Sequence, residues 1–592
     1  MKRKVSSIRK LEESIRDDFR KSCKKQEVEI SDITISYPPK IEMGDFAIPV
    51  FSIAKENKRE PDVLAKKISE TLPENDYIQW ARADRGFVNI KIKNGILFSV
   101  ICNEVEKRGE RFGWTEKSSG KNVMVEYLSP NTNKPLHLGH IRNGVLGMTT
   151  SRILEANGHK VIKANLINDR GIHICKSMLA YQKWGKGETP QSSGVKGDHF
   201  VGNMYVLFNQ KVKENPSLEK EVREMLQRWE AGDPEIKTLW KTMNNWVYEG
   251  FKETYDTYQF LFDEYYYESE TYEQGKNFVQ KGVESGIFEK TSERGVTVPL
   301  PERDFGKNED GSQKQVTLIR PDGTSVYITQ DLGTAALKTK KHKLNRLIYI
   351  VGDEQNYHFK TLFALFEMLR FPWAKNAFHL SYGMVELPEG KMKSREGTVV
   401  DADDIAAEMT ELAEEEITKR EREGGSRGNP EDKRKRAQKI GLGAIKFFLL
   451  ANDPKHRIRF NPKETLSFEG KTGPYCQYAY ARCQSILQKI EGEQKAKVDL
   501  SELGNPEELS LVRNILKFVQ SIQQAERTLN PSTVCEAIHG TAQAFNQFYH
   551  AHQVLKAETE AERSARLQLV RATSIVLKTG LALLGIEVVE KM

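Results

Sequence analysis

The sequence predicts an α/β protein in which a parallel-sheet domain carries a helical insertion and is flanked along the chain by an N-terminal α+β domain and a C-terminal all-α domain. Three observations support this prediction. The 592 residues allow about three to five domains. From Lys121 an apolar strand, a glycine-containing turn, a helix and a second strand follow one another, as at the start of a nucleotide-binding βαβ unit. From Asp432 onward the apolar residues recur with an almost wholly helical period.

The helices and strands expected before the helical insertion are predicted from capping residues and from hydrophobic periodicity. A charged helix is expected over Val5 to Gln26 and a second over Pro61 to Leu72, which begins with the Pro-Asp pair typical of a helix start. The βαβ unit then opens with the strand VMVEY and continues in a helix from His140 to Ala156. Gly158 ends that helix, and VIKANLIN is the next strand.

A helical stretch from about Asn203 to Ser285, which contains the tyrosine cluster Tyr265–Tyr267, interrupts the strand pattern. A helix from Tyr357 to Leu369 follows later. Strands are expected around it at VTLIR, SVYIT, LIYIV and FHLSYGMVEL. We therefore expect domains at residues 1–115, 116–460 and 461–592, with the helical insertion at about 185–290.

Composition excludes several classes of protein. Hydrophobic residues make up 38% and charged residues 29%, which is typical of a globular chain and not of a disordered one. No apolar stretch reaches the roughly 18 residues of a membrane helix, and the charged N-terminus does not resemble a secretory signal. The six cysteines form no CxxC pair, so we expect neither a disulfide framework nor a structural zinc site. This cysteine pattern instead suits a protein of the reducing cytoplasm.

The segment from Ser129 to His140, SPNTNKPLHLGH, follows a strand and precedes a helix. Its two histidines, His137 and His140, therefore lie at a helix N-terminus, where free backbone N–H groups and the helix dipole favour a phosphate. Gly139 leaves room for an adenine ring, and Lys134 adds a positive charge. The alternative is that both histidines only cap a structural turn.

A second basic segment, GKMKSREG, lies about 250 residues further along the chain, at Gly390 to Gly397. Taken alone, it is more often a solvated turn. Together with HLGH in the same sheet domain, it could close over a polyphosphate. The interpretation depends on both segments lying on the same side of the molecule.

HLGH combined with a KMSKS-like segment resembles the class I aminoacyl-tRNA synthetases, and the surrounding residues resemble the arginyl-tRNA synthetases in particular. The resembling stretches are VEYLSPNTNKPLHLGHIRNGVLG, PDGTSVYITQDLGTAA, IYIVGDEQNYHFKTLF, GKMKSREGTVV, GPYCQYAYAR, EMGDFAIPVFSIAK and RGFVNIKI. The resemblance implies a Rossmann-like catalytic domain and a C-terminal anticodon-binding domain. It also implies ATP-dependent activation of arginine, transfer to tRNA(Arg), and activation that usually requires tRNA.

The resemblance implies roles for individual residues in ATP chemistry. Because a carboxylate attacking a phosphate needs positioning and charge stabilisation more than acid–base help, imidazole and ammonium donors are suitable. The expected catalytic residues are His137, His140, Lys134 and Lys391. The expected ATP region comprises Gly139, Gly352, Asp353, His358, Lys393 and Ser394, with Mg²⁺ bound only through the nucleotide.

The arginine pocket is implied in the same way. A guanidinium is planar and permanently charged, so it requires carboxylates and acceptors in a fixed plane. Taken alone, Asp331 could equally be a surface or capping carboxylate, and Tyr327 is more often a core residue. The residues implied by the resemblance are Glu126, Asn131, Tyr327, Asp331 and Gln355.

The tRNA partner is indicated by charge and by aromatic residues. Glu431 to Arg459 holds nine Lys/Arg against three Asp/Glu, an excess of six positive charges that suits a phosphate backbone. Aromatic rings beside Arg can stack on unpaired bases of an RNA. The alternative is that these tyrosines only pack one helix against another. The expected tRNA-binding residues of the helical domain are Tyr475, Gln477, Tyr478 and Arg482. The family resemblance implies that Phe87 and Asn89 near the N-terminus face the tRNA elbow.

The sequence departs from the family pattern at two places. Ser394 stands where the class has a second lysine, and Lys134 is expected to supply that charge instead. In NDRG, Asp169 and Gly171 match the family, but Arg170 stands where tryptophan is more usual and His173 where glutamine is, which leaves the detailed shape of the pocket wall open.

Two other functions remain as alternatives. A small-molecule adenylyl- or cytidylyltransferase would share HxGH but predicts a far shorter chain without a helical RNA-binding domain. A catalytically dead synthetase-like RNA-binding protein predicts damaged motif residues, and only the altered KMKS segment supports it. The leading hypothesis is an arginine–tRNA ligase that acts as a monomer, without a membrane partner.

Overall fold

The computed structural model describes residues 7–30, 32–72, 75–386, 400–424, 430–491 and 498–592. The chain divides into two compact units. One comprises residues 115–466 with 528–532, and the other comprises residues 1–114, 467–527 and 533–592. Within the described residues, no helix combines the length and apolar character needed to cross a membrane.

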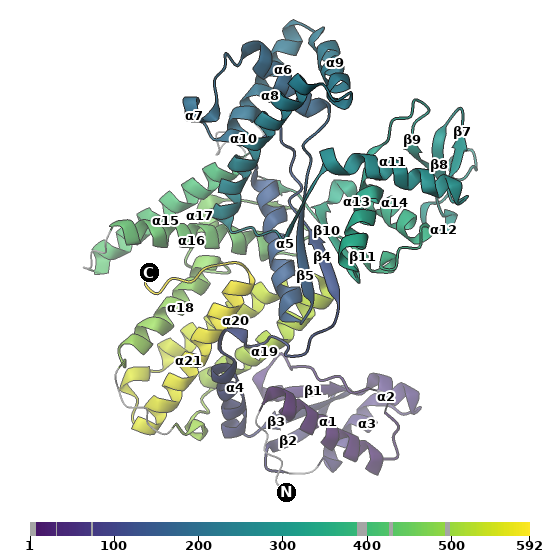
Figure 1. Cartoon of the computed structure of the whole chain (residues 1–592). Helices are drawn as coiled ribbons and strands as arrows, with labels where there is room; N and C mark the ends of the chain where they lie inside the picture. Colours follow the sequence, from purple (N-terminus) through teal and green to yellow (C-terminus); the bar gives the residue numbers. More distant parts are fainter. Residues whose placement is uncertain (1–6, 31, 73–74, 387–399, 425–429, 492–497) are drawn as a thin grey trace. The chain divides into compact units, whose positions relative to one another are not determined.

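The 115–466 unit is built on a five-stranded sheet in which every neighbouring pair is parallel (Figure 1). The strand order is β11-β10-β4-β5-β6, so after β6 the chain returns past β5 and β4 and adds β10 and then β11 on the other side of β4. This order confirms the predicted Rossmann-like fold class. The strands are β4 (Asn122–Glu126), β5 (Lys160–Ile167), β6 (Glu264–Tyr267), β10 (Arg346–Gly352) and β11 (Ala377–Tyr382).

Helices cover both faces of this sheet, as a parallel sheet requires. On one face α5 (Leu138–Ala156) lies against β4, β5 and β10, and α15 (Ala402–Gly424) and α16 (Pro430–Leu450) pack onto α5. On the other face a continuous apolar core includes Met124, Leu332, Leu347 and Phe366. The helices that supply this second core are α11 (Glu268–Glu284), α13 (Tyr327–His342) and α14 (Asn356–Met368).

The prediction of a helical stretch from Asn203 to Ser285 is wrong at Tyr265–Tyr267. The tyrosine cluster forms β6, the edge strand of the sheet, where Tyr265 and Tyr266 pair with Asn165 and Leu166 of β5. Aromatic side chains favour extended backbone, and pairing with β5 satisfies the main-chain groups. The inserted helices therefore end before the tyrosines (Figure 1). They are α6 (Ile172–Trp184), α7 (Pro190–Ser193), α8 (Gly197–Glu214), α9 (Leu218–Glu230) and α10 (Pro234–Tyr258).

The predicted strand SVYIT is also wrong, because α13 begins at Tyr327. Residues 320–324 form a tight turn in which Asp322 accepts hydrogen bonds from the backbone and side chain of Thr324. The VTLIR strand exists as β9 (Gln315–Ile319), but it belongs to a separate antiparallel sheet. That three-stranded sheet also contains β7 (Glu289–Thr291) and β8 (Gly295–Pro299).

The other unit begins with the predicted mixed α/β segment. Its three-stranded antiparallel sheet has the order β1-β3-β2, with β3 (Phe87–Ile92) in the centre. The two predicted helices are confirmed as α1 (Ile8–Lys25) and α3 (Pro61–Thr71). The remaining elements are β1 (Phe46–Pro49), α2 (Phe51–Glu56), β2 (Ile78–Asp84) and α4 (Asn94–Arg108).

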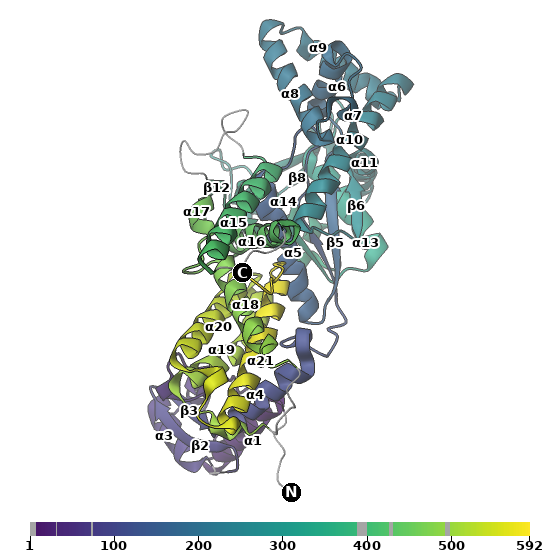
Figure 2. The ribbon, with the colours of Figure 1, turned by 90° about the vertical axis from the view of Figure 1, so that its left-hand side faces the viewer.

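The C-terminal part of this unit is helical, as predicted. Figure 2 shows its helices side by side, and α18 and α21 pack directly on each other. Their interior contains the buried ion pair between Arg566 and Glu508, at 2.9 Å. All six cysteines of the chain are free and buried. The helices are α18 (Gly473–Gln488), α19 (Pro506–Thr528), α20 (Ser532–Ala551) and α21 (Glu560–Leu583).

Candidate active site

The backbone is strained where β4 ends and the phosphate-binding turn begins. Leu128 and Ser129 have φ angles of 72° and 47°, a region that residues with a side chain rarely adopt. Two buried asparagines hold this conformation: Asn143 accepts a hydrogen bond from the Leu128 N–H, and Asn165 accepts one from the Ser129 N–H. Strain maintained by buried partners is typical of functional sites.

The HLGH turn fixes the tautomer of both histidines. His137 is the N-cap of α5, and its Nδ1 accepts the N–H of Gly139 at 3.1 Å. The Nδ1 of His140 accepts the N–H of His137, also at 3.1 Å. A neutral imidazole that accepts at Nδ1 carries its proton on Nε2. Each ring therefore presents an Nε2–H donor, and the turn determines this without any ligand.

Burial keeps both rings neutral. The pKa of His137 is lowered to about 4 by desolvation and by the nearby Lys134 ammonium. Desolvation also lowers the pKa of His140 well below its usual value, helped by His137 and Lys134. Lys134 itself is exposed. The space at Gly139 is tight: a Cβ would lie 3.0 Å from Cε1 of His137, so a side chain there would require the His137 ring to shift.

Lys391, Lys393 and Ser394 lie outside the described residues, but the residues on both sides of that segment lie at the HLGH turn. On the C-terminal side, the Leu138 N–H donates to the carbonyl of Val400, and the Ala402 N–H donates to that of Leu136. On the N-terminal side, the buried Arg142 of α5 donates to the carbonyls of Gly383 and Met384. The sequence interpretation required this proximity.

Arg142 is a positioning residue that the sequence analysis missed. Its side chain is fully buried, and it also donates to the carbonyls of Pro454 at 3.1 Å and His456 at 2.9 Å. It therefore joins α5 to two chain segments at once. The available signal was an arginine within the otherwise apolar helix sequence that follows HLGH.

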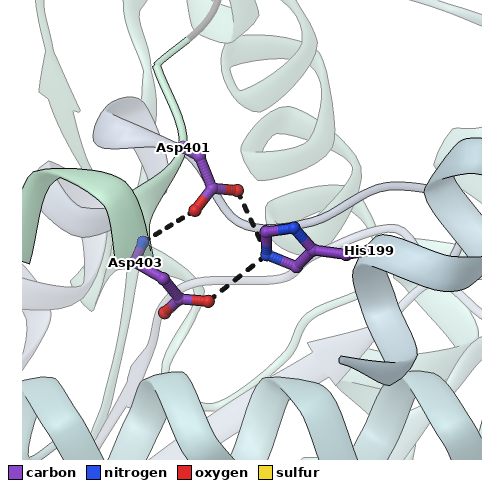
Figure 3. Close-up of side chains that lie close together, drawn as sticks. All are labelled: His199, Asp401 and Asp403. Atoms are coloured by element: carbon purple, nitrogen blue, oxygen red, sulfur yellow. Dashed lines mark hydrogen bonds and ion pairs between the residues drawn. The ribbon is translucent and has the colours of Figure 1, made fainter. Parts of the chain in front are cut away.

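The residues that follow Val400 are fixed by an ionic cluster, shown in Figure 3. Nε2 of His199, from α8, lies 3.4 Å from Asp401 and 3.3 Å from Asp403. Lys196 donates to Asp403 at 2.6 Å, and Thr254 of α10 donates to it at 3.0 Å. The hydrogen bond with Asp403 raises the pKa of His199. Although these ligand types could hold a metal, the Lys196 ammonium already supplies a positive charge.

The residues predicted for the arginine pocket lie at the start of α13, at the end of β4 and directly after β4 and β10. Tyr327 is 72% exposed, so it is not a core residue. Asp331 lies one turn further along α13 and is bound by Nε2 of His358 at 2.7 Å. Asp331 therefore lies within the helix and is not a helix cap. His358, which is predicted for the ATP region, contacts this carboxylate. Asn131 is half-buried, and Gln355 is exposed.

Glu126, the last residue of β4, has a counter-charge within the protein. Its Oε2 pairs with Nζ of Lys338 from α13, and both side chains are buried. Tyr349 of β10 is adjacent to Glu126 across the sheet. Burial, together with the charges of Glu126 and Asp331, raises the pKa of Tyr349. Both predicted carboxylates are thus close enough to act on one tyrosine.

Glu268 is a third carboxylate here that the sequence analysis missed. Burial raises its pKa to about 7, while Arg170 and a hydrogen bond with Gln330 act in the opposite direction. Its charge interacts with that of Asp331. Glu268 follows the tyrosine strand directly, and a strand prediction at those tyrosines would have placed it at the carboxyl edge of the sheet.

The NDRG segment forms part of the same region. Asp169 is buried and accepts hydrogen bonds from Tyr248 at 3.0 Å and from the Ser269 hydroxyl at 2.7 Å. Arg170 lies over the ring of Tyr272, at 3.8 Å from its centroid. The departure from the family pattern is therefore accommodated by a cation–π contact.

Gly352 and Asp353 lie where β10 ends, next to Gln355. A Cβ at Gly352 would lie 2.3 Å from a carboxylate oxygen of Glu354, so a side chain at this position would require the Glu354 side chain to move. The carboxyl edge of the sheet is where ligands of open α/β sheets bind.

Two of the predicted tRNA-binding residues are corrected by burial. Gln477 is fully buried and donates to the carbonyl of Glu587 at 2.7 Å, so it supports the helical packing. Asn89 is 4% exposed, because it lies in the central strand β3. Neither side chain is available to contact RNA directly.

The other predicted tRNA-binding residues reach the surface in part. Arg482 donates to the Tyr478 hydroxyl at 2.9 Å and to Asn546 at 2.8 Å. The ring of Tyr475 lies 5.3 Å from that of His539. Phe87 makes an edge-on contact with Phe51, which is 48% exposed.

Comparisons with family models agree along most of the chain. The model for tRNA synthetases class I (R), catalytic domain, matches residues 106–461. The model for the arginyl tRNA synthetase N terminal domain matches residues 9–92. The model for the DALR anticodon binding domain matches residues 476–592.

Individual relatives agree with these models. The arginine–tRNA ligase of Treponema denticola is 44% identical over 571 residues, covering 95% of each chain. That of Parabacteroides distasonis is 42% identical, covering 96% of each chain. The solved Thermus thermophilus arginyl-tRNA synthetase superposes with a TM-score of 0.80 at 26% identity, covering 98% of this chain and 100% of that one. This chain belongs to the arginyl-tRNA synthetase family of class I tRNA synthetases.

Proposed function

We propose that the HLGH turn binds the triphosphate of ATP and that the pocket beside it binds arginine. The chain is an arginine–tRNA ligase: it uses ATP to activate arginine and transfers it to tRNA(Arg). In the first step the arginine carboxylate attacks the α-phosphate, which forms arginyl-adenylate and releases pyrophosphate. In the second, a terminal ribose hydroxyl of the tRNA takes the arginyl group and releases AMP.

The observation that carries the phosphate assignment is the pair of Nε2–H donors on His137 and His140. Both rings are neutral and oriented by their own backbone, so they can donate to phosphate oxygens without first losing a competing partner. Lys134 adds a positive charge beside them, and Lys391 is proposed to reach the pyrophosphate from a segment whose flanks lie at this turn.

Mg²⁺ is proposed to be carried by ATP and not by protein ligands. The described donors of the turn are imidazole N–H groups and an ammonium, which fit phosphate oxygens but cannot ligate a cation. Bound Mg²⁺ would neutralise part of the phosphate charge. The side chains would orient the chain of phosphates and stabilise charge on the leaving pyrophosphate.

Arginine selection is proposed to depend on three carboxylates: Glu126, Asp331 and Glu268. Asp331, near the start of α13, and Glu268 interact through their charges. Two such carboxylates suit a guanidinium, which donates hydrogen bonds in a planar fork. Asn131, Tyr327 and Gln355 are proposed to complete the pocket. A neutral analogue would leave these acceptors without a cation, which disfavours its binding.

The helical C-terminal domain is proposed to bind the anticodon stem of tRNA(Arg), with Tyr475, Tyr478 and Arg482 at its surface. The match to the DALR anticodon binding domain supports this assignment. Phe87 is proposed to contact the tRNA elbow. The free, buried cysteines fit a reducing compartment, and we propose a monomer that acts in the cytoplasm.

The test is ATP–pyrophosphate exchange with arginine, lysine or citrulline, each with and without tRNA(Arg). Citrulline has nearly the shape of arginine but lacks its charge. We expect exchange only with arginine, and only with tRNA present. Exchange independent of both would indicate a small-molecule adenylyltransferase. No exchange under any condition, with tRNA binding intact, would indicate an inactive RNA-binding protein.

A further inference from the structure

A lysine that no step above uses lies buried beneath the arginine pocket. Lys338 of α13 is 1% exposed, and it lies seven residues, or two helical turns, after Asp331. Its Nζ pairs with Oε2 of Glu126 at the end of β4. Among the residues that the structure describes, Glu126 is the hydrogen-bond partner of this ammonium.

Two aromatic rings complete the environment of the ammonium. The Lys338 Nζ lies 5.3 Å from the ring centroid of Tyr266 and 5.4 Å from that of Tyr349, which lie on strands β6 and β10. Ring faces attract a cation and leave it little freedom to move. The Lys338 ammonium is thus held in place from two strands while it binds a carboxylate on a third.

A buried ion pair is seldom explained by stability alone, because two apolar side chains of similar volume are often as stable. The place of this pair in the fold suggests another reason. Glu126 stands at the carboxyl edge of the sheet, next to the strained turn that leads to HLGH, and it is one of the carboxylates assigned to arginine. An unrestrained carboxylate there could rotate away or attract a second cation.

We propose that Lys338 is a positioning residue for arginine recognition: it fixes the orientation of Glu126 and cancels its charge. This inference rests on the proposed role of Glu126. With Lys338 in place, Glu126 offers one oriented oxygen as an acceptor for arginine. The net negative charge that selects the guanidinium then belongs to Asp331 and Glu268, for which the described part of the chain shows no pairing with a lysine.

The experiment is a double-mutant cycle with Lys338→Met and Glu126→Gln. Arginine and ATP KM values and kcat are measured by pyrophosphate exchange with tRNA(Arg), together with the tRNA Kd and the melting temperature. Lys341→Met is the matched control, because Lys341 lies on the same helix and pairs with Glu264 but is 57% exposed. Lys338→Arg tests rescue by a second cation.

We expect Lys338→Met to raise the arginine KM at least tenfold, with the ATP KM and tRNA Kd changed less than twofold. In the Glu126→Gln background the same substitution should change the arginine KM less than twofold, since the carboxylate it positions is gone. Lys338→Arg should restore the KM to within about threefold of the wild type, and Lys341→Met should match the wild type.

Three results would overturn the inference. One is that Lys338→Met lowers the melting temperature but leaves the arginine KM unchanged. Another is an equal rise of the KM in both backgrounds, which would show that Lys338 acts without Glu126. The third is an unchanged arginine KM in Glu126→Gln, which would remove the assigned role of Glu126 as well. If Glu126→Gln raises the KM and Lys338→Met does not, the inference about Lys338 alone fails.

Discussion

The phosphate-binding turn and the arginine pocket lie on the same sheet but are prepared for their ligands in opposite ways. In the turn, Nδ1 of each histidine is fixed by a backbone N–H two or three residues away, which leaves the proton on Nε2 as a donor. In the proposed pocket, two carboxylates already have partners in the same chain: Glu126 pairs with the Lys338 ammonium, and Asp331 is hydrogen-bonded with Nε2 of His358.

This difference indicates what each ligand must do on binding. A triphosphate meets neutral donors that are already oriented, so little reorganisation opposes its binding. Arginine meets acceptors that already have partners, so its guanidinium must share or displace a cation. We therefore expect the turn to determine the rate of the chemical step, and the pocket to determine which amino acid is used.

The largest effect is expected from the turn. His140→Asn keeps an acceptor where Nδ1 lies and removes the Nε2–H donor, so it separates helix capping from phosphate binding. Loss of one preorganised donor should lower kcat for adenylate formation about 10²–10³-fold. Single-turnover pyrophosphate exchange measures the rate, and tRNA affinity is the control. A rate within threefold of the wild type would show that His140 only caps the helix.

A somewhat smaller effect is expected in the pocket. Asp331→Asn removes the charge but keeps the shape, so the arginine KM should rise on the order of 10- to 100-fold, as for a lost charge-assisted hydrogen bond. The ATP KM should stay nearly constant. His358→Gln is the matched variant, because it removes the internal partner of Asp331 but not the carboxylate. Equal changes in both KM values would place Asp331 outside the arginine site.

Glu268 sharpens the comparison through pH. Its pKa is raised to about 7, so the carboxylate is mostly protonated at pH 6 and mostly ionised at pH 8. Only the ionised form attracts a guanidinium, and the arginine KM should therefore fall up to about tenfold across this range. Glu268→Gln should remove that part of the pH dependence. An identical pH profile in the variant would exclude Glu268 from arginine binding.

The smallest effect concerns the ionic cluster beside the turn. Because Asp403 raises the pKa of His199, the charged pair contributes stability that is present in full below pH 6.5 and lost as pH rises through the raised pKa. At pH 6, His199→Gln should lower the free energy of unfolding by an amount on the order of 1 kcal/mol, which is measured as a lower melting temperature. At pH 8.5 the substitution should have little effect. A loss that is the same at both pH values would contradict a role for the charge.

The same contrast explains what the sequence could predict. The HLGH turn is made by contacts within four residues, so its histidines, glycine and helix start could be identified from local pattern. The pairing of Lys338 with Glu126 spans 212 residues, and that of His358 with Asp331 spans 27. No local pattern reveals these partners, so neither contact was predicted from the sequence.

The errors in the elements have a related cause. The tyrosine strand β6 was predicted as helix because it is a short edge strand between long helices, and its pairing with β5 is not encoded nearby. Gln477 was predicted at the tRNA surface from the residue types around it, and Asn89 from the family resemblance. Their burial depends on the packing of distant helices and strands. The parallel-sheet fold class and the flanking domains, which follow from longer patterns and from the family resemblance, were predicted in outline, but the strand order was not predicted.

The most direct test of the division between turn and pocket is a structure of the complex with tRNA(Arg), arginine and a non-hydrolysable ATP analogue. The account predicts phosphate oxygens within hydrogen-bond distance of Nε2 of both His137 and His140, and the guanidinium against Asp331 and Glu268. A triphosphate bound away from the HLGH turn, or arginine with its carboxylate toward Asp331, would contradict it.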